Sequence, residues 1–189
     1  MRDIESLVDD SIVSTETIDK MLDAYRNIKD SDIEDFLRNK ARDYQKRGWC
    51  SVYFLLDEEK KNKGEFFING YFTLSIKSLI MGDSISKTLK KKLFRGVYKE
   101  ENSIPCILIG QIGKYCSGET DKTNQYTSSM NEILDNAFEI IGQVVERIPC
   151  SFSLVECLES NNKVFDKYTD YGFKLLQVHN SFAQLFYLI

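Results

Sequence analysis

Glycine and proline are scarce in this sequence, at ten and two among 189 residues, and neither gathers into a run that separates one half from the other. Without such a run there is no candidate linker, and the lack of a repeat at a fixed period excludes a solenoid. The length lies within the usual range of one globular domain. We therefore expect a single domain that covers residues 1–189.

Long apolar runs and an excess of basic residues are also missing. No stretch approaches the roughly 18 apolar residues of a membrane span, and the sequence starts without an apolar segment after basic residues. The formal net charge of −4 at pH 7 argues against broad electrostatic attraction to nucleic acid or to an anionic membrane. We expect a cytoplasmic protein with no membrane partner.

The cysteine and histidine patterns exclude several kinds of site. The five cysteines are odd in number and show no C-x-x-C spacing, so neither a disulfide framework nor a zinc site is predicted. Carboxylates at no recurring spacing define no other metal site. The only histidine, His179, is expected in a turn, and no Gly-x-Ser-x-Gly elbow is present, so a Ser-His-Asp hydrolase has no support. Cysteines 50, 106, 150 and 157 lie in or beside apolar runs and are expected to pack as small apolar residues.

Apolar periodicity and turn residues divide the chain into helices and strands. Helices are predicted over residues 18–25, 33–44, 84–94, from 130 to near Pro149, and over 163–171, the last closed by Gly172. Strands are predicted over residues 49–56, 65–79, 106–113, 151–158, 173–178 and 181–189, with a polar loop at 57–63. This order indicates an α/β fold of the α+β kind, with a mixed, mainly antiparallel sheet that has a central parallel strand pair and flanking helices.

One pattern in the last third carries a family resemblance. Asn161-x-x-Val164-x-x-x-Tyr168-x-x-x-Gly172-Phe173 follows a predicted strand. It resembles the element of the GNAT superfamily of acyl-CoA-dependent N-acyltransferases in which Asn and Tyr flank a short helix that ends in Gly-Phe. Residues 108–115 look like the strand on which that family lays the pantetheine arm of acyl-CoA. Within the superfamily, residues 70–75 and 109–114 are most similar to bacterial and phage-type acetyltransferases, including some that act as toxins on charged tRNA.

The resemblance implies that the chain moves an acyl group, most simply acetyl, from acetyl-CoA to an amine, with Tyr168 as proton donor to the leaving thiolate. The implied cofactor-binding residues are Gln111, Ile112, Gly113, Lys114, Ser128, Ser129, Met130, Asn131 and Asn161. Other roles are open: the Tyr168 ring could simply pack on the sheet, and Asn161 could cap the helix that follows. Glu156 could hold the attacking amine or a water, or could face solvent on an alternating strand.

The phosphate-binding segment departs from the family pattern. The family carries glycines there so that backbone can approach the phosphates, whereas Ser128 and Met130 fall on the two glycine positions here. Serine N–H and hydroxyl groups can still donate to a phosphate, so weaker binding is expected. The alternative function is a GNAT-like fold that has lost catalysis and acts as a binding or regulatory module.

Partners other than acetyl-CoA are left open by the sequence. A group of basic residues in or beside the predicted helix at 84–94 suggests RNA, although a charge run is more often a solvated face; these are Lys87, Lys90, Lys91, Lys92 and Arg95. No motif names the amine acceptor, since in such a fold it is recognised by the variable opening helices, by their loop at residues 29–32 and by the segment after Leu79. The sequence also leaves open whether the chain forms a homodimer.

Overall fold

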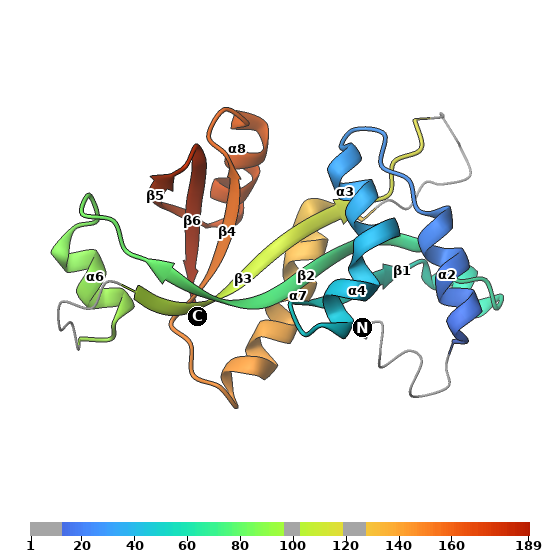
Figure 1. The fold of residues 1–189 in the computed structure, drawn as a ribbon, viewed down its shortest axis with the longest axis horizontal. Coiled ribbons are helices and arrows are strands. Elements are labelled where there is room, and N and C mark those ends of the chain that lie inside the picture. The colour runs from blue at the N-terminus through green and yellow to red at the C-terminus, as the bar shows by residue number, and fades with distance from the viewer. Residues whose placement is uncertain (1–12, 97–102, 119–127) are drawn as a thin grey trace. The chain divides into compact units, whose positions relative to one another are not determined.

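The structure, a computed structural model, describes residues 13–96, 103–118 and 128–189. The described strands form one six-stranded sheet in the order β1-β2-β3-β4-β6-β5, in which β3 and β4 are parallel (Figure 1). The pairs β1 with β2, β4 with β6 and β5 with β6 are antiparallel. The predicted mixed sheet with a central parallel pair is therefore confirmed. In chain order the elements are α2 (Thr15–Ala24), α3 (Ser31–Asp35), η1 (Phe36–Lys40), α4 (Ala41–Lys46), β1 (Ser51–Leu56), α5 (Glu58–Asn62), β2 (Ile68–Ile80), α6 (Lys87–Leu93), β3 (Ser103–Lys114), α7 (Met130–Val145), β4 (Phe152–Leu158), α8 (Asn162–Tyr171), β5 (Lys174–His179) and β6 (Phe182–Leu188).

The chain divides into two compact units. The first unit comprises Met1–Leu74 and Gln111–Ala137, and the second comprises Ser75–Gly110 and Phe138–Ile189. Strands β2 and β3 and helix α7 each run from one unit into the other. The expectation of a single domain stays a prediction.

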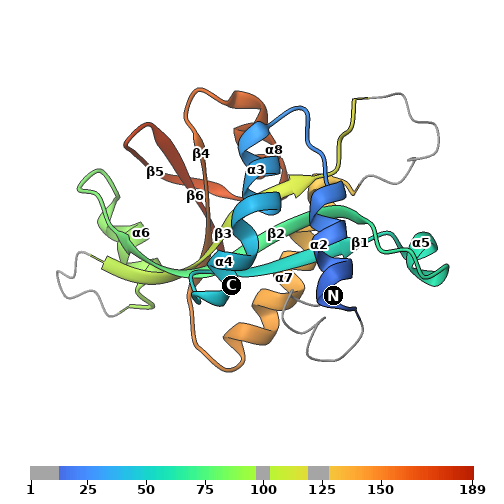
Figure 2. The same cartoon turned by 45° about the vertical axis from the view of Figure 1, so that its right-hand side comes forward.

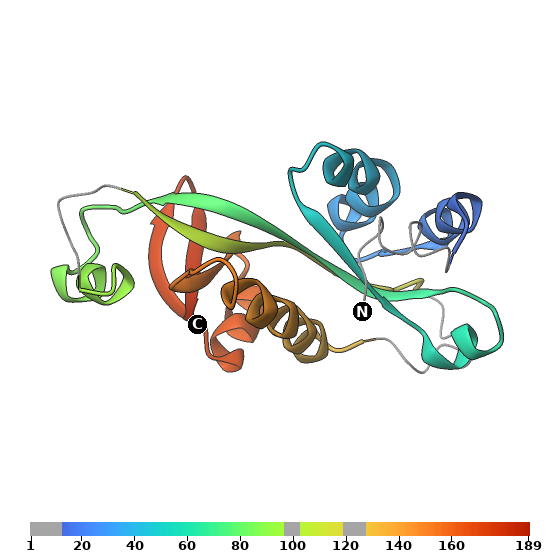
Figure 3. The same cartoon turned by 90° about the horizontal axis from the view of Figure 1, so that it is seen from below.

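In the first unit, helices α2 to α4 cover one face of β1 and β2, and the start of α7 covers the other face (Figure 3). On the α2 side, Ile18 and Leu22 belong to one buried cluster with Val52 and Tyr71. On the α7 side, the backbone at Gly70 lies so close to Ile133 that an added Cβ would come within 3.1 Å of it. Apolar burial on both faces thus fixes the strands of this unit.

The helix predicted over residues 33–44 is confirmed, but it is not uniform. It consists of α3, the π-helical segment η1 and α4, and the Ala41 N–H donates to the Phe36 carbonyl five residues back. A π-turn accommodates one extra residue within a helix. Phe36, Leu37 and Ala41 are all buried across it.

The polar loop predicted between β1 and β2 is wrong in part, because residues Glu58–Asn62 form α5 (Figure 2). The Asp57 side chain accepts a hydrogen bond from the Lys60 N–H at 3.0 Å and so caps this helix. A short charged run after an aspartate was the available signal for a helix. Charge alone gave the wrong prediction of a loop.

In the second unit, β4 packs different residues on its two faces. Leu154 belongs to a buried cluster with Leu79 and Leu93, the latter in α6. Cys157, by contrast, points to the other face, because successive side chains of a strand alternate. Figure 1 shows α8 following β4 and leading into β5.

The β5–β6 hairpin closes the second unit. Its turn consists of Asn180 and Ser181, both with positive φ, at 49° and 65°, as a two-residue type I′ turn requires. His179 is therefore the last residue of β5, and the prediction that it lies in the turn is wrong by one position. Gly172 closes α8 with φ 118°, as predicted.

Most of the cysteines pack in the interior of the protein. Cys106, Cys150 and Cys157 are buried and Cys50 is half-buried, which confirms their packing role, and all five cysteines are free thiols. Burial raises the pKa of the Cys106 thiol to about 12, so it is a poor nucleophile at neutral pH.

None of the helices in the described ranges has the length and apolar character needed to cross a membrane.

Candidate active site

The candidate site begins where β4 parts from β3 in the second unit. Among the described residues the two strands pair at two positions, Ile107 with Ser153 and Leu108 with Leu154, whereas β4 continues over residues 155–158. On its other side β4 stays paired with β6 along its whole length. Backbone groups of residues 155–158 that face away from β6 are therefore open to an extended ligand with amide groups.

Tyr168 lies on α8 and is buried, with 5% of its surface exposed. Its ring meets Phe173 edge to face, with ring centroids 5.6 Å apart. Burial raises the pKa of Tyr168 well above its usual range, and the neighbouring Cys157 adds to this. The side chain therefore stays a neutral phenol at physiological pH, the state that a proton donor requires.

Tyr168 and Glu156 belong to opposite faces of β4. Cys157 lies near enough to Tyr168 to affect its pKa, and Glu156 precedes Cys157 on the strand, so its side chain points to the other face. A thioester that passes along residues 155–158 would thus have a proton donor on one side of β4 and a carboxylate on the other. The group that could protonate the leaving sulfur and the group that could hold the attacking amine therefore lie on opposite faces of β4.

Asn161 is the N-cap of α8. Its side-chain carbonyl accepts a hydrogen bond from the Val164 N–H at 3.3 Å, which is the capping role that the sequence left open. The bond uses the oxygen of the amide and not its NH₂ group. A contact between Asn161 and a pantetheine stays a prediction.

At the end of β3, which lies in the first unit, the backbone groups of alternate residues face opposite edges of the strand. The Gln111 N–H donates to Thr73 Oγ1 at 2.8 Å, and the Tyr115 N–H donates to the Asn69 carbonyl, also at 2.8 Å. Alternate residues of a strand direct their backbone groups to opposite edges. The backbones of Ile112 and Lys114 therefore face away from β2, which makes them the better candidates for a pantetheine among residues 111–114.

Gly113 is a glycine for a packing reason. A Cβ at this position would collide with the Tyr71 ring and would come within 2.6 Å of Ile33 and 2.8 Å of the Tyr25 hydroxyl. These contacts belong to the core of the first unit and not to a ligand. The role of Gly113 in cofactor binding stays a prediction, but these core contacts already explain why the residue is a glycine.

The start of α7, also in the first unit, is a capping box that sequence reasoning missed. Ser129 Oγ accepts from the Glu132 N–H at 3.1 Å, and Glu132 Oε2 accepts from the Ser129 N–H at 3.3 Å. The signal was the Ser-x-x-Glu spacing before an apolar run. Two donors that a pyrophosphate would use are thus engaged, and a carboxylate lies at the helix end. The N–H groups of Met130 and Asn131 are the remaining donors of the first turn, while Ser128 is buried.

The predicted cofactor residues are therefore divided between the two units. Residues 111–114 and 128–131 belong to the first unit, and Asn161 and Tyr168 belong to the second. Within the described ranges, no three His, Cys, Asp or Glu side chains gather where they could hold a metal ion.

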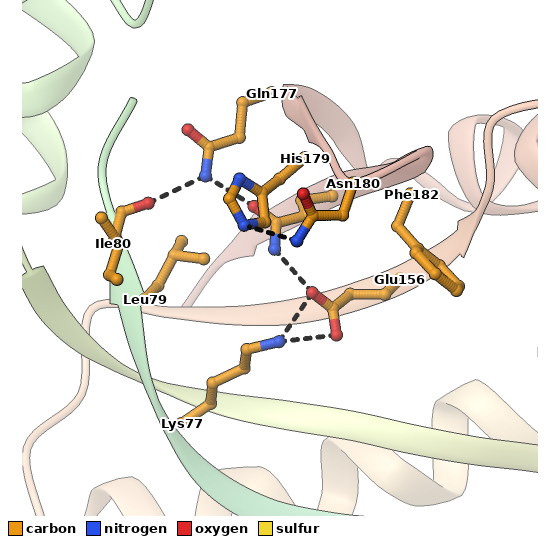
Figure 4. Close-up of a pocket in the computed structure, with 9 residues that line it drawn as sticks. Lys77, Leu79, Ile80, Glu156, Gln177, His179, Asn180 and Phe182 are labelled. Carbon is orange, nitrogen blue, oxygen red and sulfur yellow. Dashed lines mark hydrogen bonds and ion pairs between the residues drawn. The ribbon is translucent and has the colours of Figure 1, made fainter. Parts of the chain in front are cut away.

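Glu156 is neither free nor fully solvent-facing. Both of its carboxylate oxygens lie 2.7 Å from Lys77 Nζ, and Gln184 Nε2 donates to Oε1 at 2.6 Å. These side chains line an open pocket of about 370 Å³ in the second unit, called here the β4 pocket (Figure 4). Sequence spacing could not find it, because its residues come from β2, β4, β5, β6 and the turn between the last two.

The basic residues of α6 are a smaller group than predicted. Lys87, Lys91 and Lys92 are exposed, whereas Lys90 is buried, with 8% of its surface exposed. The Arg95 guanidinium donates to the Cys150 carbonyl at 3.0 Å. The prediction that all five basic residues lie on a solvated face is therefore wrong for Lys90.

No protein-family model matches the sequence, and no curated protein matches it. Solved structures do match. AtaT complexed with acetyl-methionyl-tRNAfMet is 20% identical with a TM-score of 0.66, and the match covers 88% of this chain and 86% of that chain. A tyrosine-to-phenylalanine mutant of KacT is 17% identical with a TM-score of 0.65, covering 88% and 86%. AtaTR bound with AcCoA is 18% identical with a TM-score of 0.63, also covering 88% and 86%. The chain therefore has the GNAT fold, which it shares with the AtaT and KacT structures.

Proposed function

We propose that the chain transfers an acetyl group from acetyl-CoA to an amine. The observation that carries this proposal is the parting of β4 from β3, with Tyr168 held as a neutral phenol on one face of the open strand. A structure with the same fold, AtaTR, has AcCoA bound. Both support a strand edge that holds the pantetheine arm beside a proton donor.

The reaction needs little beyond these groups. The amine nitrogen attacks the thioester carbonyl, an N–C bond forms, and the C–S bond breaks to release coenzyme A as a thiolate. The nitrogen releases its extra proton to water, and Tyr168 donates its proton to the sulfur and regains one from water. Backbone N–H groups along the open edge of β4 are suitable donors for the oxyanion that develops on the carbonyl oxygen.

Two segments would bind the cofactor together, the end of β3 and the start of α7. Ile112 and Lys114 offer backbone groups to the pantetheine, and the first-turn N–H groups of Met130 and Asn131 offer a pyrophosphate both donors and the positive end of the helix dipole. The Ser129–Glu132 capping box competes for this helix end. We expect acetyl-CoA to bind, but more weakly than at a glycine-rich loop.

The acceptor that we favour is an amine carried by RNA, namely an aminoacyl-tRNA. AtaT has been solved in complex with acetyl-methionyl-tRNAfMet, and Lys87, Lys91 and Lys92 give this chain an exposed basic helix despite its net charge of −4. Lysines that neutralise phosphates supply sequence-independent affinity for RNA. With such substrates the protein would act in the cytoplasm.

The experiment is a coenzyme A release assay with a panel of acceptors. Purified protein is mixed with acetyl-CoA and either a charged tRNA pool, uncharged tRNA or free amino acids, and free thiol is measured over time. The proposal predicts release that needs the charged tRNA and Tyr168. Release with free amino acids alone would keep acetyl transfer and reject tRNA as the acceptor.

The second candidate function is a binding or regulatory module that has lost catalysis. The Ser129–Glu132 capping box favours it, because this pair places a carboxylate where a diphosphate would lie. It predicts acetyl-CoA binding, or none, with no thiol release for any acceptor. Turnover that depends on Tyr168 would remove it.

A further inference from the structure

Helix α4 ends in a fixed turn that presents Trp49 to solvent. Gly48 has a φ of 69°, a left-handed conformation that glycine adopts without strain. The Gly48 N–H donates to the Gln45 carbonyl at 2.8 Å, and the Trp49 N–H donates to the Tyr44 carbonyl at 2.9 Å. This is the Schellman pattern of a helix end. Because these bonds hold the backbone at Trp49, its side chain leaves the helix end in one direction.

The indole of Trp49 contacts two side chains but is not buried. The Tyr44 ring meets it nearly at a right angle, with centroids 4.9 Å apart, and Arg47 Cζ lies 5.0 Å from the centre of the indole. Asp43 orients this guanidinium, since its Oδ2 lies 2.8 Å from Arg47 Nε. With these contacts made, 55% of the surface of Trp49 is still exposed. The ring therefore keeps open surface for a further planar group.

Cations are concentrated in the sequence just before this ring. Residues 38–47 contain five Lys or Arg and one Asp, although the net charge of the chain is −4. Some of these cations pair with nearby acids. Lys46, however, is exposed and forms no ion pair with any residue that the structure describes. The ion pair of Arg47 is made through Nε, so its two Nη atoms carry further N–H donors.

This combination of groups fits a nucleic acid better than a protein surface. A protein interface buries a contiguous apolar patch, whereas the exposed residues directly before Trp49 are Lys46, Arg47 and Gly48. A nucleobase has a flat face that can stack on an indole, and a phosphate accepts hydrogen bonds from lysine and arginine. In a duplex the base faces cover one another, so an aromatic side chain reaches only bases that are unpaired.

We propose that Trp49 stacks an unpaired base of an RNA strand, while Arg47 and Lys46 hold the phosphate beside that base. This inference deepens the proposed function and rests on it, because it gives an RNA-borne acceptor a second contact besides the exposed lysines of α6. Trp49 lies in the first unit, whereas α6 belongs to the second. Stacking tolerates any base, so the site adds affinity for single-stranded RNA without reading its sequence.

The test uses the fluorescence of Trp49. It is the only tryptophan in the sequence, so emission excited selectively at tryptophan reports this site alone. The probe is a short single-stranded oligouridylate, whose bases are not stacked on one another. Two matched controls have the same length: an abasic strand carries the phosphates without bases, and oligouridylate annealed to its complement has its bases paired. We expect saturable quenching by the single strand and much less by the two controls.

Variants separate stacking from charge. Fluorescence anisotropy of labelled oligouridylate measures the affinity. Trp49→Ser should weaken binding about five- to hundredfold, the range expected for a lost stacking contact. Ile28→Ser removes another exposed apolar side chain of the first unit, 62% exposed, and should bind as the wild type does. Lys46→Gln should keep the quenching at saturation but lower the slope of log affinity against log salt by about 0.7.

Two results would overturn the proposal. One is equal quenching by the abasic strand and oligouridylate, because charge alone would then explain it, and the other is unchanged affinity in Trp49→Ser. If that variant does not fold, the comparison of the three strands with the wild type decides instead. If no acceptor gives coenzyme A release, the acetyl-transfer proposal fails, whereas the quenching still shows whether Trp49 stacks on RNA bases.

Discussion

Ser129 and Glu132 cap each other at the start of α7, with the Glu132 carboxylate 3.3 Å from the Ser129 N–H and the Ser129 hydroxyl 3.1 Å from the Glu132 N–H. The pair stabilises the helix end. It also places a negative charge at the positive end of a helix that would otherwise attract a diphosphate. Helix stability and cofactor affinity therefore compete at this position.

Glu132→Gln should tighten acetyl-CoA binding. Glutamine keeps a capping acceptor but removes the charge, and charges near a helix terminus contribute about 0.3–1 kcal/mol, so the dissociation constant should fall about two- to fivefold. Isothermal titration calorimetry measures it. Glu139→Gln, at an exposed carboxylate further along α7, is the control, and an equal gain there would mean that net charge and not the capping box is responsible.

Gly113→Ala should destabilise the protein by about 1–3 kcal/mol, since the new methyl group collides with Tyr71 and crowds Ile33 in a close-packed core. Gly142→Ala on α7 is the matched control, because no atom lies within 4 Å of its added Cβ, and alanine in a helix should stabilise by up to about 1 kcal/mol. Urea unfolding measures both. Equal effects of the two substitutions would show that the crowding around Gly113 is unimportant.

Tyr168→Phe should lower kcat about a hundredfold to ten-thousandfold, the usual range for a lost general acid, without weakening acetyl-CoA binding. Burial raises the pKa of Tyr168, so its proton stays bound up to and beyond pH 10, where an ordinary tyrosine ionises. The rate of the wild type should therefore not fall between pH 8 and 10 on account of this group. A decline in that window that disappears in Tyr168→Phe would contradict the assignment.

Replacing Lys87, Lys91 and Lys92 with glutamine should weaken charged-tRNA binding and flatten its dependence on salt, because each lysine that contacts a phosphate adds about one unit to that slope. A second triple variant removes the same charge from Lys163, Lys167 and Lys174, which are exposed elsewhere in the second unit. Filter binding at several salt concentrations compares them. The same loss in both variants would reduce the α6 effect to net charge.

Much of the fold followed from the sequence. The apolar stripe of α7, the αL glycine that ends α8 and the density of apolar residues in β3 each depend on local periodicity or backbone conformation, which one sequence contains. The π-helical segment at Phe36–Lys40 could not be predicted, because it reflects packing in the core of the first unit. The helix α5 was missed because a charged run suits a loop and a short helix equally.

The site was predicted less completely than the fold, for a physical reason. Tyr168 and Asn161 were found because they share one helix and a recognisable spacing. The β4 pocket joins Lys77 to Glu156 and Gln184 across several strands, and such contacts leave no spacing in the sequence. Lys90 shows the same limit, since its burial depends on the packing around α6 and not on its neighbours in the chain.

Calorimetric titration of the wild-type chain with acetyl-CoA tests the central claim most directly. Our account predicts one saturable binding site, with a dissociation constant that is unchanged in Tyr168→Phe and lowered in Glu132→Gln. No heat of binding at high micromolar acetyl-CoA would contradict it.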